Sequence, residues 1–341
     1  MFAHSEDCAQ FCGRNRCTPP RLRATPNKNL PGSAETPLGL HPTPVACGGF
    51  SLLELIASMA VLLVISGGIF SAISSSQQSY ARTELKSDMY ENVQGAAELM
   101  AQEIGQAGLA SLPASTLTSA VSANLTAQTV NFSSTTSMFV NEQVLVDAGT
   151  NNEELVTLTS VTPLTITAVF GKAHTIGVPI NVLGVFPNGI VAPGTTDGST
   201  ANVLNIFGDI NADGSLVYVR YTCTPGTTAA PGTLTRSVTT ITPGVDVLNP
   251  SQTLLSTVVG GTGAACFQYA TTTAAGFTFV TNVGFTLSVQ ATRSDPQTAV
   301  IPQMTKSFLN LAPRDVLAGL ELANAGITSR LQPTPANVLV Y

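Results

Sequence analysis

The most regular feature of the chain is a long apolar run that begins at Phe50. Between Phe50 and Ile73 the only charged side chain is Glu54, and Leu, Ile, Val and Ala fill more than half of the positions. A helix needs about 20 apolar residues to cross the hydrocarbon layer of a membrane. The run therefore predicts a transmembrane helix over residues 50–73. The polar stretch that follows shows no small-residue cleavage signal, so we expect the helix to stay attached.

A second pattern, with helical spacing, follows this run. Apolar residues recur in steps of three or four, which places them on one face of a helix. They are Leu85, Met89, Val93, Ala96, Met100 and Ile104. Apart from glycines, no helix breaker occurs before Gly108 and Pro113. We therefore predict one helix from about residue 50 to about residue 108, whose amphipathic half, residues 74–110, is buried against the rest of the protein.

Beyond Pro113 the pattern changes to the alternation that is typical of β-strands. Three segments are rich in Val, Thr, Ile and Phe and are bounded by turn residues. They are residues 155–170, 214–222 and 277–292. The alternation predicts a β-rich domain over residues 111–341. Residues 138–182 resemble a compact β unit that also occurs in other bacterial surface proteins, which implies that such a unit is inserted in this domain.

Two segments near the C-terminus differ from this alternation. Residues 312–326 have the composition of a short helix, whereas residues 331–341 contain two prolines and are interpreted as a loose tail. The fold class that these patterns predict is α+β. One long N-terminal helix packs on a C-terminal antiparallel β-rich domain.

Charge excludes one class of function and sets an orientation. The net charge is −6, and only nine Lys or Arg are spread over the chain after Gly49, so there is no basic patch and no nucleic-acid partner is expected. The other five cations precede the apolar run. By the positive-inside rule, this flank lies in the cytoplasm and the β-rich domain lies outside.

Two cysteines, Cys223 and Cys266, follow the apolar run and would face an oxidising compartment. A disulfide between them and a pair of buried free thiols are both open interpretations at this stage. The disulfide requires a fold that brings the two Cα atoms within about 7 Å.

The segment "GDINADGS" has the opening spacing of a calcium-binding loop, with Asp209, Asn211 and Asp213 as candidate ligands. The twelfth position of that loop is Arg220 instead of a bidentate Glu. A tight Asp-Gly turn between two strands is therefore the preferred interpretation, with calcium binding as the alternative. No other cofactor is expected.

Candidate catalytic chemistry is sparse. His4 and the nearby Cys8, Cys12 and Cys17 fit no zinc-binding spacing, and the sequence places no partner beside His174. The chain also lacks a nucleophile-elbow motif and a phosphate-binding loop. We therefore expect the protein not to be an enzyme.

The residues around the start of the apolar run carry a resemblance to a known family. The pattern consists of Gly49, Phe50, Ser51, Leu52 and Glu54, followed by the hydrophobic helix. It resembles the class III signal of type IV pilins and type II secretion pseudopilins. The resemblance implies that a leader, residues 1–49, is removed after Gly49 by a prepilin peptidase and that the new terminus, Phe50, is N-methylated. Leaders of this family are usually shorter, which suggests a later translation start.

The same resemblance implies that Glu54 forms a salt bridge with the terminal amine of an adjacent subunit during filament assembly. Electrostatics agrees with this role. A carboxylate at the centre of a membrane costs about 2.5–3.5 kcal/mol and is normally paired. Cleavage after Gly49 would create an ammonium group four residues from Glu54. A carboxylate that only reaches the lipid headgroups is the simpler alternative.

Two further stretches, "ELMAQEIGQAGL" and the pair "GSLVYVRYTC" and "PGTLTRSV", resemble PilW-like minor pilins and J-type pseudopilins more loosely. Together the resemblances imply a pilin-like fold and a minor pilin that primes, caps or decorates a type IV pilus. A minor pseudopilin of a type II secretion system is the alternative. A surface adhesin held by an uncleaved signal anchor is an alternative of another class.

The resemblance also implies the partners and the location. The expected partners are other pilin or pseudopilin subunits, the prepilin peptidase, the assembly platform of the inner membrane and the membrane lipid itself. The subunit is expected to cross the bacterial inner membrane once, with its C-terminus outside, before it enters a pilus or a periplasmic pseudopilus.

Overall fold

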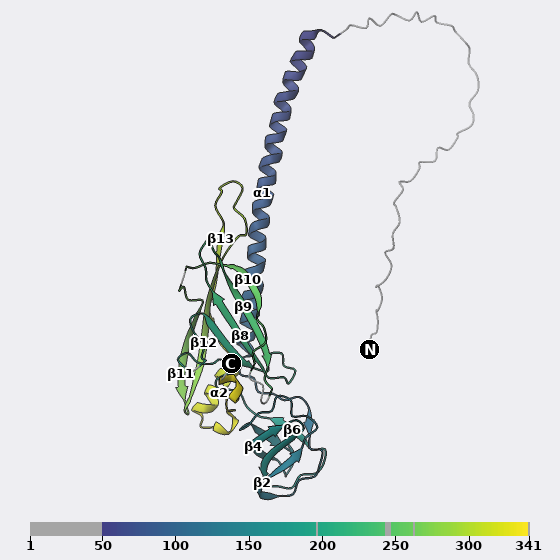
Figure 1. Ribbon diagram of the computed structural model, residues 1–341, viewed down its shortest axis with the longest axis vertical. Helices are drawn as coiled ribbons and strands as arrows, with labels where there is room; N and C mark the ends of the chain where they lie inside the picture. Colours follow the sequence, from purple (N-terminus) through teal and green to yellow (C-terminus); the bar gives the residue numbers. More distant parts are fainter. Residues whose placement is uncertain (1–49, 196, 243–246, 262, 340–341) are drawn as a thin grey trace, which may run out of the picture. The chain divides into compact units, whose positions relative to one another are not determined.

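The computed structural model describes residues 50–195, 197–242, 247–261 and 263–339 (Figure 1). The predicted leader, residues 1–49, lies outside the described residues. The chain divides into two compact units, Met1–Leu62 and Leu63–Tyr341. Helix α1, Leu52–Gln106, begins in the first unit and ends in the second.

The 55 residues of α1 confirm the single long helix that the sequence predicts. All six residues of the predicted stripe, from Leu85 to Ile104, are buried. The helix ends just before Gly108, which has a positive φ of 88°. A side chain at this position would bring its Cβ to 2.9 Å from the carbonyl oxygen of Phe186, so only glycine allows the chain to turn away here.

The larger sheet has seven strands, and every strand pair in it is antiparallel (Figure 1). Its strands are β7 (Val203–Gly208), β8 (Val217–Thr224), β9 (Gly232–Thr240), β10 (Gln252–Val258), β11 (Phe267–Ala274), β12 (Phe277–Gln290) and β13 (Gln303–Leu311). The order is β11-β12-β10-β9-β8-β7, and β13 pairs with β12.

The main hydrophobic core lies between α1 and this sheet. Met100 and Ile104 of the helix stripe belong to one buried cluster with Tyr221 of β8, Leu234 of β9 and Val283 of β12. The amphipathic half of α1 is therefore held by burial of its apolar face, as its spacing predicts.

The smaller sheet has six strands and its own core. Its strands are β1 (Ser115–Thr116), β2 (Asn124–Asn131), β3 (Gln143–Val146), β4 (Glu154–Thr162), β5 (Thr165–Phe170) and β6 (Pro179–Val182), in the order β1-β6-β3-β4-β5-β2. A bridge between Leu117 and Phe132 joins the two ends of this order, so the sheet closes on itself around a separate hydrophobic cluster. The inserted unit is thus larger than the predicted residues 138–182, because β1 and β2 precede them.

The C-terminal region contains helix α2, Arg314–Asn324, where the sequence predicts a short helix. Two short 3₁₀ helices follow, η1 (Thr328–Arg330) and η2 (Ala336–Leu339). The prediction of a loose tail is wrong for the part of the tail that the structure describes. Gln332 is buried, and its Nε2 donates to the carbonyl oxygens of Gln143 and Leu183, both at 2.8 Å. These hydrogen bonds satisfy backbone groups, which fixes the tail in place.

Candidate functional site

The first half of α1 exposes an unusual amount of apolar surface. The exposed large side chains are Leu52, Leu53, Leu55, Ile56, Met59, Val61, Leu62, Leu63, Val64, Ile65, Ile69, Phe70 and Ile73. Among the described residues, α1 is the one helix that is long and apolar enough to cross a membrane, judged by length and composition. A contiguous apolar surface of this size is typical of segments that contact lipid or another protein, and α1 has the length and composition of a membrane anchor.

The start of α1 holds the predicted assembly residues, except Gly49, which lies outside the described residues. Phe50 is 82% exposed. Ser51 caps the helix: its Oγ accepts the N–H of Leu53 at 3.3 Å, and its carbonyl oxygen accepts the N–H of Glu54 at 3.0 Å. Glu54 lies in the first turn, where the helix dipole favours a negative charge.

No salt bridge within the described part of this single chain includes Glu54. It is also the only charged residue between Phe50 and Ala81. Within the described residues, Glu54 is thus a lone exposed carboxylate on an exposed apolar segment.

The second half of α1 is tied to the sheet by a buried charge cluster that the sequence analysis missed. Glu103 accepts a hydrogen bond from the Tyr221 hydroxyl at 2.5 Å and one from Arg236 Nε at 3.2 Å, and Arg236 Nη2 contacts its other oxygen. The side chains of Glu103 and Arg236 are only 7% and 22% exposed. The cluster joins α1 to β8 and β9 by a bidentate ion pair.

The cluster perturbs the acidity of its members. Burial raises the pKa of the Tyr221 hydroxyl, and the negative charge of Glu103 raises it further. Burial alone would lower the pKa of Arg236, but the hydrogen bond and charge of Glu103 outweigh it and raise that pKa. Glu103 could have been found in the sequence, because it follows Met100 by three residues and so shares the buried face.

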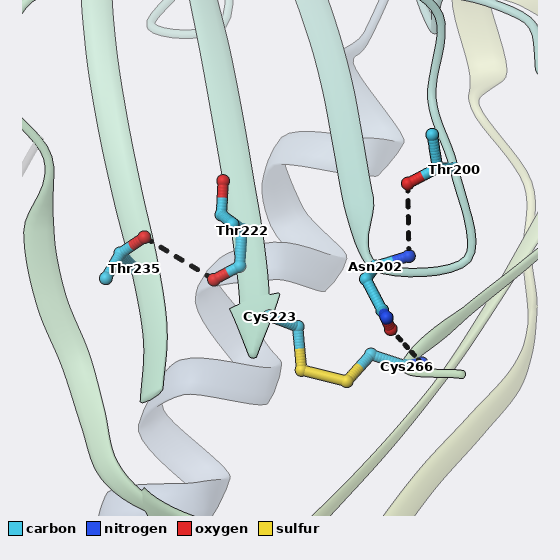
Figure 2. The surroundings of a disulfide bond; sticks show 6 residues. All are labelled: Thr200, Asn202, Thr222, Cys223, Thr235 and Cys266. Carbon is cyan, nitrogen blue, oxygen red and sulfur yellow. Dashed lines mark hydrogen bonds between the residues drawn. A yellow bond between two sulfur atoms is a disulfide. The ribbon is translucent and has the colours of Figure 1, made fainter. Parts of the chain in front are cut away.

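Cys223 and Cys266 form a disulfide between the end of β8 and the residue before β11 (Figure 2). Their Cα atoms are 6.4 Å apart, within the distance that the covalent geometry requires. Both are buried, and the N–H of Cys266 donates to Asn202 Oδ1 at 3.2 Å. The larger sheet therefore carries a covalent link across strands that are distant in sequence.

Asp209 lies in a tight turn between β7 and β8. Its Oδ1 accepts the N–H of Asp213 at 3.0 Å, and its Oδ2 accepts the N–H of Gly214 at 2.9 Å and the hydroxyl of Ser111. Asn211 and Asp213 are exposed. No group of three His, Cys, Asp or Glu side chains suited to a metal occurs among the described residues. The geometry is that of the Asp-Gly turn, because protein donors already occupy both oxygens of Asp209.

His174 is buried in the smaller sheet between two carboxylates. Its Nε2 lies 2.7 Å from Glu154 Oε1, and its Nδ1 lies 3.7 Å from Asp147 Oδ2. The ring also packs edge-on against Phe170. These contacts tie the loop after β3, the start of β4 and the loop after β5 together, which is a structural role.

Glu142 is buried just before β3, and this burial raises the pKa of its carboxyl group well above 4.5, despite an opposing hydrogen bond from the N–H of Phe139. The folded state therefore favours the protonated acid. Its contribution to stability is fully present below pH 4.5 and is lost as the pH rises through the pKa of the folded state.

We predict that Glu142→Gln is more stable than the wild type at pH 7 and that this difference disappears near pH 4, because the amide mimics the neutral acid. Thermal unfolding at several pH values measures the difference. The exposed Glu321→Gln removes one carboxylate elsewhere and serves as the control. A gain that does not change between pH 4 and pH 7 would contradict the assignment of a buried neutral acid.

Comparison of the chain with models of known protein families, with curated proteins and with solved structures finds no match. Function is therefore inferred from the residues of this chain alone. The buried clusters described above join elements of the fold, whereas the first half of α1 exposes an apolar surface with one acid.

Proposed function

We propose that the protein is a pilin-like subunit that α1 first anchors in a membrane and then inserts into a filament, where the subunit acts as a minor component of a type IV pilus. The observation that carries this proposal is the exposed apolar surface from Leu52 to Ile73 with Glu54 in its first turn. A lipid layer and a bundle of similar helices are the two environments that can cover such a surface.

Glu54 favours the bundle of helices over the lipid layer as the final environment of α1. A carboxylate in an apolar bundle requires a cation, and the described residues of one chain supply none. Cleavage after Gly49 would place an ammonium group on Phe50, at the same level of the bundle. Pairing between the acid of one copy and the amine of its neighbour satisfies both charges and fixes the axial position of the incoming subunit.

Features of the rest of the chain support the proposal that the β-rich part is exported. The Cys223–Cys266 disulfide is suited to an oxidising compartment. The ion pair of Glu103 with Arg236 and the buried stripe hold the second half of α1 firmly on the larger sheet. The larger sheet, held on α1, is therefore carried outside with the helix, where the β-rich part decorates, primes or caps the filament.

We expect Glu54→Ala to enter the membrane as well as the wild type but to be depleted from sheared filaments about tenfold or more, the factor that a loss of about 1.4 kcal/mol produces. Immunoblots of the membrane and filament fractions measure both quantities. Glu84→Ala changes an exposed acid on the same helix and should behave as the wild type.

The mature N-terminus tests the proposal independently. Mass spectrometry of the polypeptide extracted from membranes should find a chain that begins at an N-methylated Phe50. Retention of residues 1–49, together with normal incorporation of Glu54→Ala, would overturn the proposal and favour an adhesin held by an uncleaved anchor.

A further inference from the structure

Strand β2 carries two short sequences of the type Asn-x-Ser/Thr. They are Asn124-Leu125-Thr126 and Asn131-Phe132-Ser133. This tripeptide is the acceptor sequence for N-linked sugars, provided that the middle residue is not proline. Sequence alone gives the two sites equal weight, so the distinction between them depends on their geometry.

The first site lies on a bulge of β2, the last strand in the order of the smaller sheet (β2 is labelled in Figure 1). Asn124 pairs with Phe170 and Gln128 pairs with Ala168, so the three residues between them on β2 face a single residue of β5. Gln128 Nε2 donates to the carbonyl oxygen of Ser122 at 2.9 Å, which closes the base of the bulge. The whole acceptor tripeptide is exposed, and Leu125 is 88% exposed.

The side chain of Asn124 is folded over its own acceptor tripeptide. Its Oδ1 accepts the backbone N–H of Thr126 at 3.0 Å and the hydroxyl of Thr126 at 2.9 Å. This is an Asx turn closed by a second donor. Two donors on Oδ1 draw electron density towards the oxygen, which is the polarisation that allows Nδ2 to lose a proton as it attacks. No hydrogen bond within the described residues involves Nδ2 of Asn124.

The second site lacks these features. Phe132 is buried in the core of the smaller sheet at 2% exposure. The hydroxyl of Ser133 accepts the N–H of Thr116, and the carbonyl oxygen of Asn131 accepts the N–H of Thr118, because this end of β2 is joined to the segment around β1. Asn131 and Ser133 are themselves exposed, but these hydrogen bonds and the buried Phe132 hold the tripeptide in the paired, extended form, without the Asx turn of the first site.

We propose that Asn124 is a site of N-linked glycosylation and that Asn131 is not. Nδ2 of Asn124 attacks C1 of a sugar that a lipid-linked or nucleotide-linked diphosphate donor supplies. The N–C1 bond forms, the C1–O bond breaks and the diphosphate leaves with the electron pair. The Nδ2 proton passes to a base of the transferase. The attached saccharide covers the exposed bulge and its apolar Leu125 side chain.

The test uses the full chain purified from its native host. A glutamate-specific protease releases the segment between Glu103 and Glu142, and electron-transfer fragmentation assigns any added mass to a single residue. The expected result is a saccharide mass on Asn124 and none on Asn131. An Asn124 that is found only unmodified overturns the proposal, as does a saccharide on Asn131.

Four variants test the assignment to Asn124 and the role of the Thr126 hydroxyl. Asn124→Gln and Thr126→Ala should both abolish the added mass, whereas Thr126→Ser, which keeps the hydroxyl, should retain it. Asn131→Gln should leave the mass unchanged. A saccharide that persists in Thr126→Ala would overturn the role of the hydroxyl and with it the proposed site. All of these positions except Asn131 lie on the exposed bulge, so the fold is not at risk.

Discussion

Glu103→Ala is expected to lower the free energy of unfolding by about 3 kcal/mol, because breaking a buried ion pair on one side leaves the other charge without compensation. The substitution removes both hydrogen bonds of the Arg236 guanidinium to the carboxylate and the acceptor of the Tyr221 hydroxyl. It also detaches α1 from β8 and β9 at one point. Urea unfolding of the full chain in detergent, followed by circular dichroism, measures the change.

Glu98→Ala provides the matched control, since Glu98 is an exposed acid on the same helix and its removal should change stability by less than about 0.5 kcal/mol. Replacing both partners with apolar residues, as in Glu103→Leu with Arg236→Met, should recover most of the loss. Equal stabilities for Glu103→Ala and Glu98→Ala would show that the cluster contributes nothing.

The double substitution Cys223→Ser with Cys266→Ser is expected to lower the free energy of unfolding by about 4 kcal/mol. The two cysteines are 43 residues apart, and a cross-link over a loop of this length restricts the unfolded chain by roughly that amount. Both positions are buried, so the hydroxyls add a smaller loss from unpaired polar groups. Urea unfolding under oxidising conditions measures the difference.

Reductant supplies the control for this prediction. The wild type in the presence of a strong thiol should approach the stability of the double variant, whereas the double variant should not respond. A wild type whose unfolding midpoint is the same with and without the thiol, while its thiols become reactive, would contradict a stabilising cross-link.

The sequence was sufficient to predict those elements that depend on residues close to one another along the chain. The stripe from Leu85 to Ile104 predicts which face of α1 is buried, and Gly108 marks its end, since both depend on residues within a few turns. The alternation in residues 155–170 predicts β4 and β5 for the same reason. The closure of the smaller sheet, by contrast, depends on a contact between Leu117 and Phe132 that no local pattern encodes.

The pairs that build the buried clusters could not be predicted in this way. Glu103 and Arg236 meet because α1 crosses β9 at a position that the strand register determines, and Tyr221 lies opposite Arg236 in that register. His174 likewise contacts Glu154 because of the way the strands of the smaller sheet are paired. Distances between such residues follow from tertiary packing, so the sequence could propose the disulfide but could not decide it.

The chain enters and leaves the smaller sheet at neighbouring points, because Ser115 of β1 pairs with Ile180 of β6, and Leu109 bridges to Val185. A segment with adjacent ends can be exchanged for another of different length without altering the course of the flanking chain. The scaffold of α1 and the larger sheet can therefore carry an inserted unit of a different length or sequence at this position without a change in its own fold.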